Sequence, residues 1–178
     1  MLSFQNIPSI ATPEFAQAWQ LYEEAFPAEE RRSSHQQLEL FQIPEYAFKI
    51  VLQEEELIGL LGIWSLAEFS FLEHFAIGQH LRGRGLGKAI INFLKESHLS
   101  PIILEVEPPT TTLSQCRISF YQQLGFCLNS FPYQQPPYSS DKPWVPLQLM
   151  SFPASLSQEA FTQIRSRLYQ TVYQVQPS

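Results

Sequence analysis

A glycine-rich stretch with two arginines and a lysine is the part of the sequence best suited to hold an anion. It reads Phe75-Ala-Ile-Gly-Gln-His-Leu-Arg-Gly-Arg-Gly-Leu-Gly-Lys88 and joins an apolar, strand-like run to a helical pattern. Backbone N–H groups at the start of a helix point outward together, and glycines let a bulky pyrophosphate approach the backbone closely. The stretch therefore predicts a phosphate-binding loop at a strand-to-helix junction.

The spacing of this loop differs from that of two common nucleotide-binding motifs. A P-loop needs Ser or Thr directly after its lysine, but Ala89 follows Lys88. The dinucleotide fingerprint needs a third glycine three residues after the second, whereas the glycines here are Gly83, Gly85 and Gly87. A nucleotide-binding domain of another fold would also need a magnesium ligand or a ribose-binding carboxylate, and the sequence offers no clear candidate for either.

The spacing Arg82-x-x-Gly85-x-Gly87 resembles the acyl-coenzyme A loop of the GCN5-related N-acetyltransferase (GNAT) superfamily. Tyr121-Gln-Gln-Leu-Gly-Phe126 is similar to the Tyr-x-x-x-Gly-Phe pattern that closes the motif region of that family. The resemblance extends over roughly residues 46–126. It implies binding of acetyl-coenzyme A, without a metal, through residues of the strand end and the loop: Phe75, Ala76, Ile77, Arg82, Gly83, Arg84, Gly85, Leu86, Gly87 and Lys88.

The activity implied by the resemblance is transfer of the acetyl group to a primary amine of a small molecule or peptide, by direct attack on the thioester. Tyr121 matches the family tyrosine that protonates or hydrogen-bonds the coenzyme sulfur, so we expect it to be the general acid. Glu73 and Glu105 match positions where members place a carboxylate that accepts the amine proton, and we rank Glu73 slightly first. By strand alternation Glu73 shares a face with Phe71 and Phe75, where partial burial would raise its proton affinity.

Each of these residues also has a structural interpretation. Tyr121 could be an aromatic side chain packed beside Phe126, and either glutamate could be a strand-end charge or the buried partner of an arginine. His74, the neighbour of Glu73, is expected to point to the opposite face and to be structural. A non-catalytic acyl-coenzyme A-binding or sensing module is therefore the alternative function.

Two features depart from the family pattern. Ser114 stands where members often have Asn, and the fifth strand leads into the unusual turn Pro108-Pro-Thr-Thr-Thr112, so the cofactor contacts of the following helix are in doubt. Arg117, on the same helix, either binds an acidic group of the cofactor or faces solvent, and we favour the second interpretation.

Apolar periodicity predicts the elements that position these residues. Helices are expected over residues 13–26, 28–41, 85–95, 114–124 and 157–173, and strands over residues 46–53, 57–64, 71–77, 101–107, 126–130 and 145–150. Together with the resemblance, this order predicts an α/β (α+β) fold. We expect a mixed, mostly antiparallel sheet of six to seven strands with a parallel pair at strands 4 and 5, flanked by helices, in one domain over residues 1–178.

Three segments have less certain roles. The charged run Glu29-Glu-Arg-Arg32 reads as a solvated helix face. The Pro-rich segment 131–144 is expected to be an exposed loop, whose aromatic side chains either line an acceptor pocket or cover the core: Tyr133, Tyr138 and Trp144. In the last helix, one apolar stripe either packs internally or forms a dimer contact: Phe161, Ile164, Leu168 and Val172.

Composition and charge limit the partners. The chain has 178 residues, a formal charge of −6 and no Lys/Arg stripe, which argues against nucleic-acid binding. No apolar run approaches the roughly 18 residues of a membrane-spanning helix. Cys116 and Cys127 read as reduced core thiols. We expect a cytoplasmic monomer or homodimer that binds acetyl-coenzyme A and an amine, and neither nucleic acid nor membrane.

Overall fold

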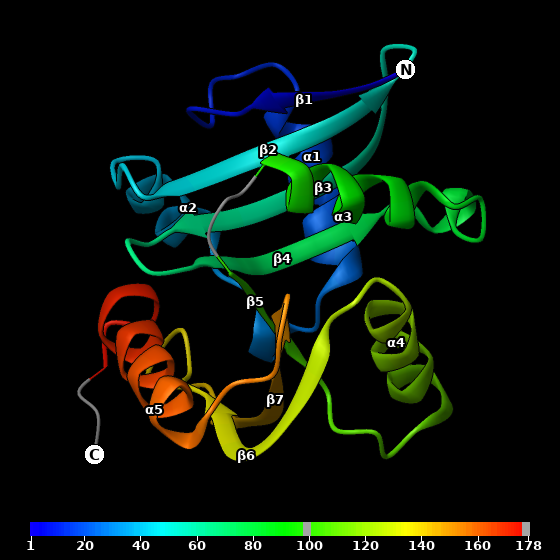
Figure 1. The fold of residues 1–178 in the computed structure, drawn as a ribbon. Coiled ribbons are helices and arrows are strands. Elements are labelled where there is room, and N and C mark those ends of the chain that lie inside the picture. Colours follow the sequence, from blue (N-terminus) through cyan, green and yellow to red (C-terminus); the bar gives the residue numbers. More distant parts are fainter. Residues whose placement is uncertain (98–100, 176–178) are drawn as a thin grey trace. The chain divides into compact units, whose positions relative to one another are not determined.

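A hairpin and two further strands build an antiparallel sheet in the first part of the chain. The computed structural model describes residues 1–97 and 101–175, and the chain divides into two units, residues 1–100 and 101–178. The first unit contains four strands that pair antiparallel in sequence order: β1 (Leu2–Asn6), β2 (Tyr46–Gln53), β3 (Glu56–Ser65) and β4 (Ser70–Ile77) (Figure 1). The predicted strands 46–53, 57–64 and 71–77 are confirmed, and β1 is an addition.

The β2–β3 turn is a two-residue turn made by two glutamates. Gln53 pairs with Glu56, and between them Glu54 and Glu55 have φ values of 51° and 68°. Positive φ at both central residues is typical of the type I′ turn, whose twist matches that of the flanking strands. The polar turn predicted between the two apolar runs is therefore confirmed.

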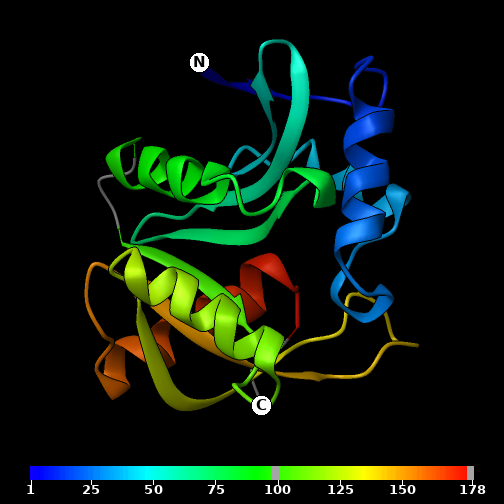
Figure 2. The same cartoon turned by 90° about the vertical axis from the view of Figure 1, so that its right-hand side faces the viewer.

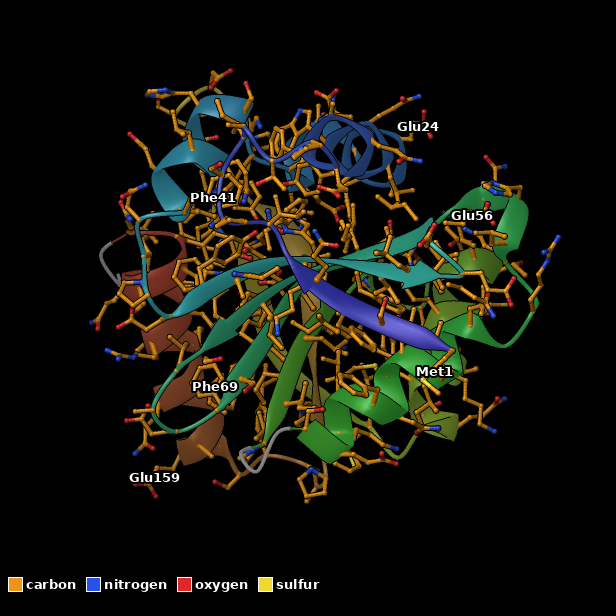
Figure 3. The ribbon with its side chains drawn as sticks, turned by 90° about the horizontal axis from the view of Figure 1, so that it is seen from above. Met1, Glu24, Phe41, Glu56, Phe69 and Glu159 are labelled. Atoms are coloured by element: carbon orange, nitrogen blue, oxygen red, sulfur yellow. The ribbon has the colours of Figure 1, made fainter. Side chains whose placement is uncertain are left out.

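Helices cover both faces of this sheet. Helices α1 (Phe15–Ala25) and α2 (Ser34–Leu40) lie on one side of the strands, and α3 (Leu86–Ser97) lies on the other (Figures 2 and 3). Helices α1 and α3 each bury an apolar stripe, which in α1 includes Phe15 and Tyr22 and in α3 includes Ile90, Ile91 and Leu94. Where α3 packs on the sheet, the ring of Phe93 stacks on that of Phe4 in β1, with centroids 4.0 Å apart.

The prediction of one continuous helix over residues 28–41 is wrong. A short 3₁₀ turn, η1 (Ala28–Glu30), is followed by extended backbone at Arg31, and α2 begins only after Ser33. Ser33 caps α2: its hydroxyl accepts from the N–H of Gln36, and the Gln36 side chain accepts in turn from the N–H of Ser33. This capping box stops the helix from extending further toward the N-terminus.

We expect Ser33→Ala to lower the free energy of unfolding by about 1 kcal/mol, because the N–H of Gln36 in the first turn of α2 loses the hydroxyl that accepts from it. Urea unfolding followed by circular dichroism measures this change. Ser34→Ala is the matched control, since Ser34 is an exposed residue in the first turn of the same helix. Equal effects of the two substitutions would contradict the role assigned to the cap.

The second unit contains a three-stranded antiparallel sheet. Strand β7 (Val145–Phe152) pairs with β5 (Ile102–Val106) on one side and with β6 (Cys127–Gln135) on the other. Helix α4 (Thr112–Gln123) covers one face, and α5 (Gln158–Arg167) covers the other (Figure 1). The predicted strands 101–107 and 145–150 and the predicted helix 114–124 are confirmed, and α4 is followed by Gly125 with φ of 88°.

The predicted loop over residues 131–144 is partly wrong, because β6 continues to Gln135. The register of β6 against β7 shifts between Asn129 and Tyr133, and Pro132 lies within this irregularity. A proline, which has no N–H to donate, is tolerated there because the ladder is interrupted at that position. Residues 136–144 form the actual connection to β7.

The C-terminal apolar stripe packs inside the second unit. Helix α5 is followed by a π-helical segment, η3 (Leu168–Val172), and Phe161, Leu168 and Val172 are buried. The ring of Phe161 lies 5.0 Å from that of Phe131 on β6. Cys116, in contrast, is exposed on α4, and Cys127 is half-buried, so the description of both as core thiols is wrong.

Candidate active site

The glycine loop has the backbone geometry and the charge of an anion site. Gly83 and Gly85 have φ values of 79° and 77°, and a Cβ built on either would meet no heavy atom within 4 Å. The side chains of Arg82, Arg84 and Lys88 are exposed. The first turn of α3 has no acidic residue, so the positive end of the helix dipole is not neutralised there. Cations, open glycine backbone and helix N–H groups therefore lie on consecutive residues at the start of α3.

The strand that leads into the loop is pressed closely against β3. Phe75, Ala76 and Ile77 pair with Leu61, Leu60 and Gly59 in turn. A Cβ on Gly59 would lie 2.7 Å from the carbonyl oxygen of Ala76, a separation that real Cβ atoms essentially never reach. Glycine at position 59 therefore permits the close pairing that fixes the end of β4.

A β-bulge in β4 changes the expected direction of two side chains. Gly62 pairs with His74 and Ile63 pairs with Leu72, so Glu73 is an extra residue on β4. An extra residue interrupts strict alternation. The expectation that His74 points away from Glu73 is wrong, because His74 Nδ1 lies 3.8 Å from Glu73 Oε2.

Glu73 is the centre of a buried polar cluster. Its side chain has no exposed surface, and Oε1 forms an ion pair with the guanidinium of Arg32, which is only 5% exposed. The indole Nε1 of Trp64 donates to Oε2 at 2.8 Å, and the guanidinium also lies over the Trp64 ring. Both carboxylate oxygens of Glu73 therefore already accept from protein donors.

His74 and Tyr22 connect this cluster to the loop between α1 and α2. His74 Nε2 lies 3.0 Å from the carbonyl oxygen of Glu30, which can only accept, so Nε2 carries the hydrogen. The Tyr22 hydroxyl accepts from the N–H of Arg32 at 2.7 Å. Burial lowers the pKa of His74 and raises that of Tyr22 above its ordinary value, which keeps both side chains neutral near pH 7.

Glu105 lies in the second unit, half-buried on β5, and accepts hydrogen bonds from two tyrosines. The hydroxyl of Tyr173 lies 2.9 and 2.8 Å from the two carboxylate oxygens, and the hydroxyl of Tyr133 also donates to Oε1. Burial, followed by the charge of Glu105, raises the pKa of Tyr133 well above its ordinary value. The phenol therefore stays protonated and remains a donor.

Tyr121 is buried on α4 between the rings of Phe120 and Phe126, with centroids 5.1 and 5.5 Å away. Burial raises its pKa to about 12, and the charge of Arg117 opposes part of this shift. Within the described ranges, its hydroxyl makes no hydrogen bond. Tyr121 is thus a packed aromatic side chain whose hydroxyl stays protonated near pH 7.

The two doubtful positions on α4 have local explanations. Ser114 is the third residue of a capping box: its N–H donates to the Thr111 side chain, and its hydroxyl accepts from the Thr111 N–H. Arg117 forms an ion pair with Glu107 at 3.0 Å, and both side chains are nearly half exposed. The interpretation of Arg117 as part of the solvent-facing surface agrees with this exposure.

The candidate residues belong to different units of the chain. The loop, the end of β4 and Glu73 lie in the first unit, whereas Glu105 and Tyr121 lie in the second. Sequence reasoning missed four partners of the glutamates: Arg32, Trp64, Tyr133 and Tyr173. A signal existed for Arg32, because the Ser33-x-x-Gln36 capping box places it outside the helix.

Comparison with known proteins supplies the family. The sequence profile of the acetyltransferase (GNAT) family matches residues 15–126. This chain belongs to the GNAT acetyltransferase family. Its fold superimposes on a protein assigned to the GNAT acetyltransferases from Bacteroides thetaiotaomicron with a TM-score of 0.92 and 33% identity, covering 98% of this chain and 99% of the other.

More distant solved structures share the fold. The ribosomal-protein-S18-alanine N-acetyltransferase from Escherichia coli is 19% identical, with a TM-score of 0.61 over 89% of this chain and 97% of that one. An aminoglycoside 6′-N-acetyltransferase in complex with coenzyme A is 18% identical, with a TM-score of 0.58 over 84% of this chain and 95% of that one. No curated protein sequence matches this chain. The predicted GNAT fold class is confirmed.

Membrane-spanning helices and groups of metal-binding side chains are both absent from the described residues, 1–97 and 101–175. None of the helices there combines the length and apolar character that crossing a membrane requires. No group of three or more His, Cys, Asp or Glu side chains in those ranges is arranged to hold a metal ion.

Proposed function

We propose that this GNAT acetyltransferase is an N-acetyltransferase, which transfers the acetyl group of acetyl-coenzyme A to a primary amine of a small molecule or peptide. The observation that carries the proposal is the cationic loop at the start of α3, where Gly83 and Gly85 have positive φ and open space beside their Cα atoms. Membership of the family supports acetyl-coenzyme A as the donor. Its pyrophosphate would bind the N–H groups of the loop and the first turn of α3.

In this proposal the residues from Phe75 to Lys88 hold the cofactor, and the backbone of Phe75 and Ile77 holds the thioester end. The amine attacks the thioester carbonyl carbon as a neutral nucleophile, so a base has to take one of its protons. The C–S bond then breaks, and the coenzyme leaves as a thiolate. Tyr121 is proposed as the hydrogen-bond donor to that sulfur.

Of the two candidate bases, we now rank Glu105 ahead of Glu73. Glu73 is fully buried and paired with Arg32, whose guanidinium stays charged, so protonation of Glu73 would leave that charge unpaired. Glu105 is half-buried and accepts hydrogen bonds from the neutral phenols of Tyr133 and Tyr173. Because these phenols carry no charge, protonation of Glu105 does not leave a charged partner behind, as protonation of Glu73 would. Cytoplasmic location, and a monomeric or dimeric state, stay predictions from the sequence.

The first experiment is isothermal titration of the protein with acetyl-coenzyme A, beside an Arg82→Ala, Gly85→Ala, Gly87→Ala triple variant. We expect micromolar binding by the wild-type chain and at least tenfold weaker binding by the variant, because phosphate contacts and the positive-φ backbone are lost together.

Two control variants separate local loss from general damage. Arg167→Ala removes one exposed cation from α5, and Gly125→Ala introduces a side chain at another positive-φ glycine, where φ is 88°. Both should keep the wild-type affinity. A folded wild-type protein that does not bind acetyl-coenzyme A would contradict the proposal, and binding without amine-dependent release of thiol would favour the sensing module.

A further inference from the structure

The π-helical segment η3 delivers a tyrosine to the carboxylate that we rank first as the base. The N–H of Tyr173 donates to the carbonyl oxygen of Leu168, five residues earlier, at 3.1 Å. π-Helical turns are rare, and many of those that do occur lie at functional sites. Two tyrosine hydroxyls of this turn bond to strands of the sheet. Tyr169 donates to the Gln134 carbonyl oxygen on β6 at 2.6 Å, and Tyr173 donates to Glu105 on β5.

Burial and ring packing hold Tyr173 in place against Glu105. Tyr173 is 7% exposed, and its ring packs against that of Tyr138 with centroids 5.4 Å apart. Its hydroxyl lies within 2.9 Å of both carboxylate oxygens, so its single hydrogen can be shared between them. Tyr133 adds a donor from β6, so phenols from two different elements converge on one half-buried glutamate.

We propose that Tyr173 is a positioning residue for acetyl transfer, which holds Glu105 ionised and oriented to accept the proton of the attacking amine. This inference rests on the proposed function. In the step concerned, the amine nitrogen forms a bond to the acetyl carbon, its proton passes to Glu105, and the C–S bond breaks with the electron pair leaving on sulfur. Tyr173 does not exchange a proton; it stabilises the carboxylate before the attack.

Four tyrosines lie at or near Glu105 among the described residues of the second unit. Tyr133 and Tyr173 bond to it directly, and Tyr138 and Tyr169 lie beside these two rings. Burial raises the pKa of Tyr169, as it does that of Tyr133, so both are uncharged near neutral pH. Removing one phenol donor from a carboxylate destabilises its charged form, and the carboxylate then takes up a proton at higher pH.

The test compares Tyr173→Phe with Tyr169→Phe. Each variant keeps the ring and removes one buried hydroxyl from the same part of the chain, but only Tyr173 bonds to Glu105. Carbon-13 NMR of protein labelled on the glutamate side-chain carboxyl, with Glu105 assigned through Glu105→Gln, reports protonation without any substrate. We expect the midpoint of the Glu105 titration to rise by about one pH unit in Tyr173→Phe and to stay in place in Tyr169→Phe.

The kinetic readout uses thiol release from acetyl-coenzyme A, with 2-phenylethylamine and the tripeptide Ala-Ala-Ala as probe amines. In Tyr173→Phe the acidic limb of kcat/KM should move to higher pH, and kcat/KM on that limb should fall several-fold, with unchanged affinity for acetyl-coenzyme A. Tyr133→Phe, which removes the other donor, should move the limb in the same direction and serves if Tyr173→Phe does not fold.

Several outcomes overturn the inference. A Glu105 midpoint that is equal in Tyr173→Phe and Tyr169→Phe shows that Tyr173 does not stabilise the carboxylate. A shifted midpoint with an unmoved kinetic limb shows that the contact has no role in the reaction. If the folded wild-type chain does not bind acetyl-coenzyme A, or binds it without turnover, the proposed function fails as well; normal wild-type turnover with an unaffected Tyr173→Phe removes only the role of Tyr173.

Discussion

Replacing Arg32 by methionine should lower the free energy of unfolding by about 3–5 kcal/mol, as is common when one partner of a buried ion pair is removed. The side chain of Glu73 has no exposed surface, so its charge cannot be solvated once the guanidinium is gone. The Trp64 indole N–H remains as a donor but supplies no counter-charge. Because folded domains are typically stable by only about 5–15 kcal/mol, this loss would be visible directly in urea unfolding.

The cycle with Glu73→Gln identifies the cause. Glu73→Gln alone should also be strongly destabilising, since it leaves Arg32 charged and 5% exposed. The double variant should cost less than the sum of the two single variants, because neither side chain is then charged. Its apolar and amide replacements keep most of the volume, so a cavity makes only a small contribution.

An exposed ion pair supplies the matched control. Arg117 and Glu107 approach to 3.0 Å, but their side chains are 45% and 43% exposed. Arg117→Met should therefore change the free energy of unfolding by less than about 1 kcal/mol. If Arg32→Met costs no more than Arg117→Met, the buried pair does not fasten the α1–α2 connection to β4, and the argument against Glu73 as the base weakens.

The fold could be predicted well from the sequence because its patterns are local. Alternating apolar runs and the Glu54-Glu55 turn determine the hairpin, and the apolar stripes of α1 and α3 determine these two helices. The second helix was predicted too long because the charged run Glu29–Arg32 was interpreted as its solvated first turns, whereas Arg32 is buried and lies outside the helix. The Ser33-x-x-Gln36 capping box, also visible in the sequence, is what makes the helix begin after Ser33.

The candidate site was less predictable, since side-chain partners depend on contacts distant in sequence. Glu73 and Arg32 are 41 residues apart, and Glu105 and Tyr173 are 68 apart. No periodicity reveals such a pair. The bulge that places Glu73 and His74 in contact also breaks the alternation on which the prediction of opposite faces depended. The junction of strand, glycine loop and helix was predictable because it consists of consecutive residues, and its binding of phosphate stays a prediction.

The second large effect concerns Tyr121, for which we expect Tyr121→Phe to lower kcat by about tenfold to a hundredfold with little change in affinity for acetyl-coenzyme A. A hydrogen bond to a charged group contributes about 1.5–3 kcal/mol, which corresponds to that range of rate. The ring remains, so packing against Phe120 and Phe126 is retained. Steady-state kinetics with the two probe amines, beside isothermal titration with acetyl-coenzyme A, gives both quantities.

The raised pKa of Tyr121 decides what kind of donor it is. At about 12, its pKa lies above that of an ordinary thiol, which is about 8.5, so the free protein would not favour complete proton transfer from the phenol to a thiolate. Tyr121 is therefore better suited to donating a hydrogen bond to the sulfur as charge develops. It keeps its proton throughout the neutral and mildly alkaline range, so its ionisation should produce no alkaline limb in kcat there.

Tyr169→Phe is the matched control for this prediction, because it removes another buried phenol hydroxyl, one that donates to the Gln134 carbonyl oxygen. It should leave kcat close to the wild-type value. A loss of more than about ten-thousandfold in Tyr121→Phe would exceed what one hydrogen bond provides and would instead require obligatory proton transfer by Tyr121. An unchanged kcat would leave the tyrosine as an aromatic packing residue of α4, the structural interpretation that its position between two phenylalanine rings also permits.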